Sequence, residues 1–216
     1  GHEDVKGASN HVSPSVMEYS VSFTAGALMR EEAAQVIEEV NRGTALEAVD
    51  PDVLDVNSHR GRNRKAMEVV RRLESADRSV WEDFLELSPT EQQLTLYYCC
   101  LKTYRLLFDF HMDVVLPKWQ SFDRDLRPHD ARRFLERRAD DHPEIDDWGE
   151  STWEKARQVM LKMLREAGLL GDGSLQPPQV PSAFWERFVR VGDIWFLEAA
   201  FLKERDRTSV INAVQS

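Results

Sequence analysis

Basic side chains are concentrated where one predicted helix begins, in residues 60–72. This segment contains six basic residues and one acidic residue, Glu68, so its local net charge is +5 in a chain of net charge −10. Guanidinium groups bind phosphate and can donate two hydrogen bonds to the edge of a guanine. A solvated basic face balanced by acidic neighbours such as Glu38 and Glu39 would give the same pattern. The candidate nucleic-acid-binding residues of this segment are Arg60, Arg62, Arg64, Lys65, Arg71 and Arg72.

A second polar stripe lies on the helix predicted to begin at Ser151. Four of its polar residues are spaced i, i+3, i+7 and i+10, which places them on one helix face opposite the apolar positions. Thr152 lies at the N-terminus, and helix N-termini favour phosphate. Packed helices without any ligand show the same spacing, so the stripe alone leaves both interpretations open. The candidate residues here are Thr152, Lys155, Gln158, Lys162 and Arg165.

Residues that could support catalysis do not converge. Asp109, His111 and Asp113 alternate along a predicted helix, so their side chains point in different directions and form neither a metal site nor an acid–base pair. The sequence contains no glycine-rich phosphate loop, HExxH or GxSxG motif. We therefore predict a protein that is not an enzyme and has no metal, cofactor or small-molecule substrate.

The two cysteines and the hydropathy pattern indicate a cytoplasmic protein. Cys99 and Cys100 are adjacent on a predicted helix, where side chains diverge, so we expect no disulfide between them, and a reducing compartment fits. The longest uninterrupted apolar run, residues 96–101, is far shorter than the roughly 20 residues that cross a bilayer. We expect no integral membrane segment.

A long apolar helix over residues 88–116 is expected to position both basic helices. Ser88 can cap it, Pro89 fits its first turn, and Glu91 completes a capping box. Pro117 is expected to end it. Apolar residues lie on more than one face, which is typical of a helix surrounded by other elements. We therefore predict a compact all-α fold around this central helix.

Two helix-turn-helix-like elements are predicted on either side of the central helix. The first ends in a helix over residues 59–73, whose apolar stripe is Ala66, Val69, Val70 and Leu73. That stripe should direct Arg64, Lys65, Arg71 and Arg72 toward solvent. The second contains the Ser151 helix, with a capping box at residues 151–154, and is followed by residues 169–180 as either a loop or a small two-stranded wing.

The predicted organisation has three parts. Residues 1–17 form a polar tail. Residues 18–120 form an N-terminal helical half with the first helix-turn-helix-like element and the central helix. Residues 121–216 form a C-terminal helical half with the winged-helix-like element. We expect the two halves to share one core.

Several stretches of the chain resemble the BrxA family. They are residues 22–28 (Ser-Phe-Thr-Ala-Gly-Ala-Leu), 101–110 (Leu-Lys-Thr-Tyr-Arg-Leu-Leu-Phe-Asp-Phe), 151–155 (Ser-Thr-Trp-Glu-Lys) and 164–170 (Leu-Arg-Glu-Ala-Gly-Leu-Leu). The family often has Ser-Thr-x-x-Arg where this chain has Gly61-Arg62-Asn63-Arg64-Lys65, so the likeness is stronger at the Ser151 helix than at the first basic helix.

The resemblance implies a component of a bacteriophage exclusion (BREX) defence system, compared in fold with a NusB-like RNA-binding antitermination factor. It also implies binding of double-stranded DNA through helix-turn-helix elements and contact with other BREX components. We predict a non-enzymatic, cytoplasmic DNA-binding accessory component. The alternatives are a protein–protein interaction scaffold within the defence complex and a NusB-like RNA-binding protein.

Overall fold

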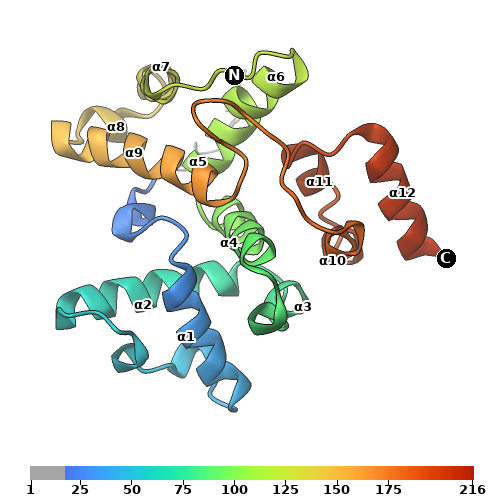
Figure 1. The fold of residues 1–216 in the computed structure, drawn as a ribbon. Coiled ribbons are helices and arrows are strands. Elements are labelled where there is room, and N and C mark those ends of the chain that lie inside the picture. Colours follow the sequence, from blue (N-terminus) through green and yellow to red (C-terminus); the bar gives the residue numbers. More distant parts are fainter. Residues whose placement is uncertain (1–17) are drawn as a thin grey trace, which may run out of the picture.

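The computed structural model describes residues 18–216, and this part of the chain is built from helices joined by short connections (Figure 1). The predicted all-α fold is confirmed. The predicted polar tail over residues 1–17 lies outside the described residues. The α-helices are α1 (Arg30–Asn41), α2 (His59–Glu74), α3 (Arg78–Trp81), α4 (Pro89–Thr103), α5 (Arg105–Phe110), α6 (Leu116–Gln120), α7 (Pro128–Ala139), α8 (Pro143–Asp146), α9 (Glu150–Glu166), α10 (Glu186–Arg190), α11 (Trp195–Ala199) and α12 (Glu204–Gln215).

Short 3-10 turns and one π-helical segment complete the described secondary structure. The 3-10 turns are η1 (Ser22–Ala25), η2 (Leu46–Ala48), η3 (Pro51–Val53), η4 (Phe84–Glu86) and η6 (Ser182–Trp185), and the π-helical segment is η5 (His111–Val115).

The central helix is interrupted, so the prediction of one helix over residues 88–116 is only partly correct. Its start is as expected, because the Ser88 hydroxyl accepts from the Glu91 N–H at 3.3 Å and the Glu91 carboxylate accepts from the Ser88 N–H at 3.1 Å. Tyr104, with φ −113° and ψ 108°, is extended and separates α4 from α5. Pro117 does not end the helix: it lies in the first turn of α6, where the N–H that it lacks is not required.

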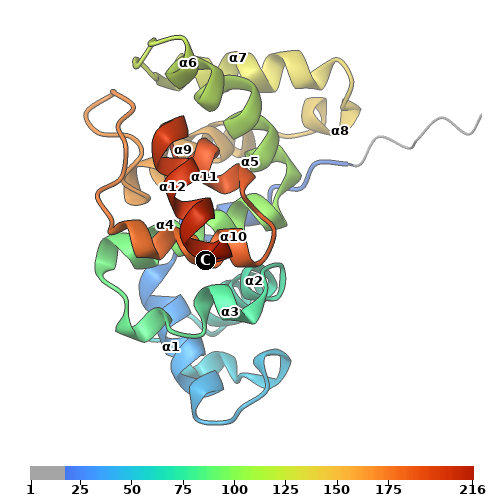
Figure 2. The ribbon, with the colours of Figure 1, turned by 90° about the vertical axis from the view of Figure 1, so that its right-hand side faces the viewer.

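The remaining helices surround α4 and α5. In Figure 1, α1 and α2 lie on one side, α7 to α9 on a second side, and α10 to α12 on a third; Figure 2 shows α10 to α12 stacked over α4 and α5. The buried side chains form a cluster that draws on all of these groups, from Phe23 and Val36 to Phe134, Met160 and Phe196. The division into two halves near residue 120 stays a prediction.

Helix α9 begins one residue earlier than predicted, at Glu150, after the N-cap residue Gly149. The predicted capping box at Ser151 is therefore wrong, because Ser151 already lies inside the first turn. After α9, residues 169–180 contain isolated antiparallel bridges, Leu170 with Leu175 and Ser174 with Asp125, and no strand. Of the two predicted alternatives, this segment is a loop. The two helix-turn-helix-like elements stay predictions.

No helix in the described part of the chain is both long enough and apolar enough to span a bilayer.

Candidate nucleic-acid interface

The short turn η1 lies between α2 and α9 and contacts both helices (Figure 1). Phe23, the middle of this turn, is fully buried and packs edge-on against Tyr104, with ring centroids 5.6 Å apart. The Thr24 N–H donates to the Val21 carbonyl at 3.0 Å, which closes the turn. Ser22 and Thr24, which flank Phe23, have small side chains. The turn η1 therefore leaves the neighbouring side chains of α2 and α9 uncovered.

Helix α2 presents some of its predicted cations to η1. Arg60 and Arg64 are exposed, and Arg64 Nη2 lies 3.4 Å from the Thr24 hydroxyl. Arg71 is also exposed and donates from Nη1 to the Ser22 hydroxyl at 3.0 Å. Arg71 Nη1 also lies 3.8 Å from Glu68 Oε1. Arg64 and Arg71 thus reach the same turn from points two helical turns apart.

Two other α2 cations, Arg62 and Lys65, likewise lie near acidic residues. Arg62 Nη1 donates to the Val56 carbonyl at 2.8 Å, and its Nε lies 3.5 Å from Asp52 Oδ1. Lys65 Nζ lies 3.7 Å from Glu32 Oε1. Both side chains are about two-thirds buried, so they are less accessible to a large anion than Arg60 or Arg64.

The prediction that Arg72 faces solvent is wrong, because its side chain is 2% exposed. The guanidinium donates to the carbonyl oxygens of Ala27 at 2.5 Å, Gly26 at 2.9 Å and Phe23 at 3.2 Å, and Nε donates to the Tyr104 hydroxyl at 2.8 Å. Burial alone would lower the pKa of Arg72, but the nearby Cys100, Tyr104 and Glu68 raise it above its ordinary value. Arg72 is therefore charged and cannot contact a ligand in solvent.

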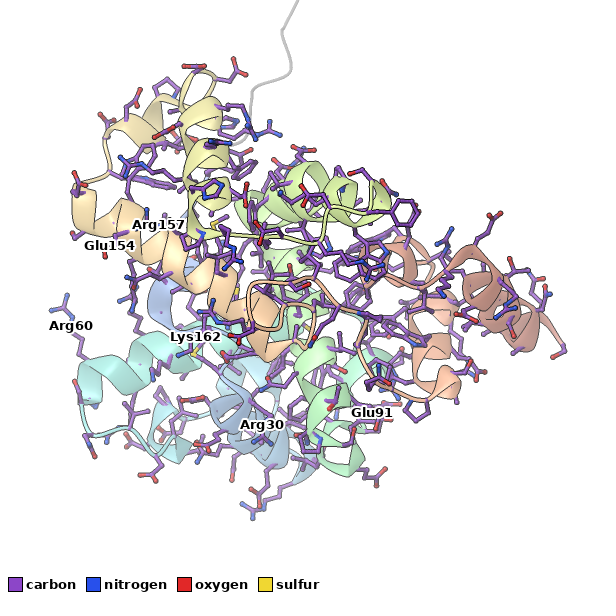
Figure 3. The ribbon with its side chains drawn as sticks, turned by 45° about the horizontal axis from the view of Figure 1, so that its top comes forward. Arg30, Arg60, Glu91, Glu154, Arg157 and Lys162 are labelled. Atoms are coloured by element: carbon purple, nitrogen blue, oxygen red, sulfur yellow. The ribbon has the colours of Figure 1, made fainter. Side chains whose placement is uncertain are left out.

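Helix α9 carries the predicted stripe on an exposed face. Lys155, Gln158, Lys162 and Arg165 are all exposed, while Ala156, Met160, Met163 and Leu164 on the opposite face are buried. Within residues 18–216, no ion pair involves Lys155, Lys162 or Arg165. In Figure 3, Arg60 projects from the end of α2, and Lys162 lies on the side of α9 that faces α2.

Two adjoining hollows connect the α9 stripe with η1 and α2. The first, about 330 Å³, is lined by Thr24, Ala25, Gly26, Ala27, Lys155, Gln158, Val159, Lys162 and Arg165. The second is more open, about 600 Å³, and is lined by Val21, Ser22, Thr24, Arg64, Ser151, Thr152 and Lys155. Thr24 and Lys155 belong to both. We call the surface formed by these two hollows the basic face.

The side chains that line the basic face are donors rather than carboxylates. Its lining residues supply ammonium, guanidinium, amide and hydroxyl donors, and no carboxylate lines either hollow. This is notable in a chain whose Asp and Glu outnumber its Lys and Arg by 38 to 28. Charged and hydroxyl donors of this kind contact phosphate oxygens in nucleic-acid interfaces. Sequence reasoning did not predict that Ser22 and Thr24 line this surface, because their position depends on the tertiary packing of η1 against α2 and α9.

Asp109, His111 and Asp113 each have separate structural partners. Asp109 accepts from Tyr19 Oη at 2.6 Å and Arg105 Nε at 2.9 Å, while Asp113 pairs with Arg138. His111 is buried: its Nε2 lies 2.7 Å from the Ala199 carbonyl and its Nδ1 2.6 Å from the Tyr97 hydroxyl. No group of three potential metal ligands occurs among residues 18–216.

The chain is similar to one protein family, to one relative of that family and to one solved structure. The model of a family described as BrxA matches residues 17–186. A protein of Bacillus cereus (strain H3081.97), named BREX protein BrxA, is 24% identical over 150 residues, which cover 68% of this chain and 75% of the relative. The crystal structure of an uncharacterized protein from Magnetospirillum magneticum is similar, with a TM-score of 0.68 and 19% identity over 85% of this chain and 98% of that one. That likeness concerns the fold alone.

Proposed function

We propose, from the premise that this chain belongs to the BrxA family and is a BREX defence component, that it binds double-stranded DNA through the basic face without catalysing a reaction. The candidate DNA-contacting residues are Arg60, Arg64, Arg71, Thr152, Lys155, Gln158, Lys162 and Arg165, joined by Ser22 and Thr24. A cytoplasmic location and contact with other BREX proteins are part of the proposal.

The observation that carries the proposal is the absence of carboxylates from the lining of the basic face, in a chain of net charge −10. Unpaired surface cations repel one another unless an anion is bound, so a face with several of them and no compensating acid suits a polyanion. The α9 stripe from Lys155 to Arg165 is about 15 Å long. Duplex DNA carries one phosphate charge per roughly 1.7 Å of axis, so this length passes about nine phosphates, of which only the nearer ones can be bound.

The number of accessible cations sets the expected salt dependence. Lys155, Lys162, Arg165 and Arg64 line the hollows, and neutralising about four phosphates gives a slope of about −3.6 for log K against log[salt]. Fluorescence anisotropy with a labelled duplex of about 25 base pairs, measured from low to physiological salt, tests this value. A binding constant that does not change with salt would rule the proposal out.

A matched pair of variants tests the location of the site. Lys155→Ala, Lys162→Ala and Arg165→Ala combined remove three charges from the basic face. Arg190→Ala, Lys203→Ala and Arg205→Ala combined remove the same charge from the region of α10 and α12, which lies on another side of α4 (Figure 1). We expect the first variant to lose most of its affinity and the second to keep it. Equal losses would show that net charge alone drives binding.

A docking scaffold is the second candidate function, favoured by Phe122. This aromatic side chain is 83% exposed in the turn after α6, and its backbone is in the left-handed region with φ 60°. Substituting Phe122→Ser and measuring co-purification with other BREX proteins tests this function. If unlabelled RNA displaces the labelled duplex at a lower concentration than unlabelled duplex DNA does, RNA becomes the better assignment for the basic face.

A further inference from the structure

We propose that Arg72 is the positioning residue of the basic face: buried beneath it, Arg72 sets the spacing between the α2 cations and the α9 stripe. It does so by holding residues 21–29, which precede α1; their turn η1 contacts both α2 and α9, and we call this segment the strap. This inference rests on the proposed DNA binding. It concerns a residue that cannot itself touch DNA, since its side chain is 2% exposed.

One side chain of α2 binds the backbone carbonyls of the strap, whereas Arg64 and Arg71 reach only the hydroxyls of Thr24 and Ser22. The Arg72 guanidinium binds three strap carbonyls, those of Phe23, Gly26 and Ala27, at 3.2, 2.9 and 2.5 Å. The guanidinium is planar and presents its donors in a fixed fork, so three simultaneous bonds fix both the position and the orientation of the strap. The three carbonyl oxygens therefore point toward Arg72, which leaves few acceptors to oppose an anion on the basic face.

The buried side chains of Phe23 and Leu28 anchor the two ends of the strap in the core, but the segment between them has few other anchors. Ala25, Gly26 and Ala27 form part of the floor of the first hollow, and their side chains are too small to anchor it. The other fastening is on the α9 side, where the Leu28 N–H donates to Glu166 Oε1 at 3.3 Å. Met29 at the end of the strap has φ 54°, an unfavourable conformation for a residue other than glycine. Such a conformation persists where surrounding contacts over-determine it.

Arg72 is itself fixed by the break in the central helix. Tyr104, the extended residue between α4 and α5, accepts from Arg72 Nε at 2.8 Å and donates to the Glu68 carboxylate. Its ring also lies under the guanidinium, 5.2 Å from centroid to Cζ. Because Glu68 supplies a compensating negative charge nearby, the effect of Arg72 on DNA binding is positional rather than electrostatic.

The key variant is Arg72→Lys, which keeps the charge but loses the fork. An ammonium group cannot reach three carbonyls and Tyr104 in the same geometry. We expect this variant to fold, to bind duplex DNA on the order of tenfold more weakly at low salt, and to show a salt slope shallower by about one phosphate, or about 0.9. A folded Arg72→Lys variant with wild-type affinity and slope would overturn the inference.

A control separates positioning from general loss of stability. Leu101→Ala removes a buried side chain of α4 that is not part of the strap. At a temperature where circular dichroism shows both variants folded, Leu101→Ala should retain wild-type affinity and slope. Hydrogen exchange should be faster at residues 23–28 in Arg72→Lys and unchanged there in Leu101→Ala. Equal effects of both variants on DNA binding would contradict a positioning role.

Glu166→Ala provides a second variant that leaves no buried charge unpaired. It removes the α9 hydrogen bond to Leu28 and should make the salt slope shallower, by less than Arg72→Lys does. The slope is the readout, because loss of the Glu166 charge beside Arg165 by itself favours DNA. If Arg72→Lys does not fold, an unchanged slope in Glu166→Ala would overturn the inference instead.

A double-mutant comparison tests the spacing directly. By this inference, Arg72 keeps the α2 cations and the α9 stripe at a distance that one duplex can span. Arg64→Ala and Lys155→Ala should then each cost less affinity in the Arg72→Lys background than in the wild type. Equal costs in both backgrounds would overturn the inference while leaving the proposed function intact. Failure of the wild-type chain to bind any duplex would overturn both.

Discussion

Arg187 and Asp83 form a two-bond ion pair, with Nη1–Oδ1 at 2.7 Å and Nη2–Oδ2 at 3.1 Å. Arg187 belongs to α10, and Asp83 follows α3, so the pair joins segments 104 residues apart. Arg187 also donates to the carbonyls of Val80 and Phe184, both at 3.1 Å. One guanidinium thus fastens the C-terminal helices to the turn that precedes α4.

The first prediction concerns the stability provided by this pair. Asp83 is 38% exposed and Arg187 is 15% exposed, so solvent weakens the attraction but leaves the Val80 and Phe184 carbonyls dependent on Arg187. We expect Arg187→Ala to lower the free energy of unfolding by about 1–3 kcal/mol. Urea denaturation measures this loss. Arg187→Lys should recover only part of it, because an ammonium group cannot form the two parallel bonds to Asp83.

The second prediction distinguishes two residues of the interrupted central helix. Leu101 is 3% exposed, so Leu101→Ala should cost about 2–5 kcal/mol through the cavity that it leaves. Phe108 is only partly buried and packs edge-on against Trp195, at 5.4 Å between ring centroids. Phe108→Ala should therefore cost less than a fully buried phenylalanine would. Thermal melting checks the order, and a larger loss at Phe108 than at Leu101 would contradict the burial argument.

Sequence reasoning predicted the parts of the fold that depend on near neighbours. The Ser88 capping box and the buried stripe of Ala66, Val69 and Leu73 follow from residues within one or two helical turns. The burial of Arg72 could not be predicted in this way, because its carbonyl partners lie 45 to 49 residues earlier in the chain.

The same limit applies to the basic face. The spacing of Lys155, Gln158, Lys162 and Arg165 follows from helical periodicity, and all four residues are exposed as predicted. Arg64 and Lys155 line the same hollow because η1 packs between α2 and α9. Helical spacing within one element cannot predict this tertiary packing.

The third prediction is a pH dependence of stability that arises from His111. A carbonyl only accepts hydrogen bonds, so Nε2 donates to Ala199 and Nδ1 accepts from Tyr97, which fixes the neutral imidazole. Burial lowers the pKa of His111 from 6.5 to about 4. The unfolded chain therefore binds a proton first as the pH falls. The stabilisation is complete above about pH 6.5, declines between pH 6.5 and 4, and amounts to about 3 kcal/mol.

Urea denaturation of the wild type and of His111→Gln at pH 7 and pH 5 isolates the His111 effect, because the other five histidines and the carboxylates are present in both proteins. His111→Gln has no proton to gain, so its stability should differ less between the two pH values than that of the wild type. Stability that changes equally between pH 7 and pH 5 in the wild type and in His111→Gln would show that His111 is not held in the neutral form.

The fourth prediction ranks the cations of α2. Arg64 is exposed and lines the open hollow with Lys155, whereas Arg62 is tied to the Val56 carbonyl and lies 3.5 Å from Asp52. Both substitutions to alanine remove one positive charge, so a nonspecific effect of net charge would weaken DNA binding equally. We expect Arg64→Ala to lower affinity several-fold and to make the salt slope shallower by about 0.9, the value for one lost phosphate contact. Arg62→Ala should leave the slope unchanged, because the Arg62 guanidinium already has partners within the protein.

Parallel anisotropy titrations of the two variants over the same salt range decide between these outcomes. A larger slope change for Arg62→Ala than for Arg64→Ala would place the DNA contact on the acidic side of α2 rather than on the side that faces η1.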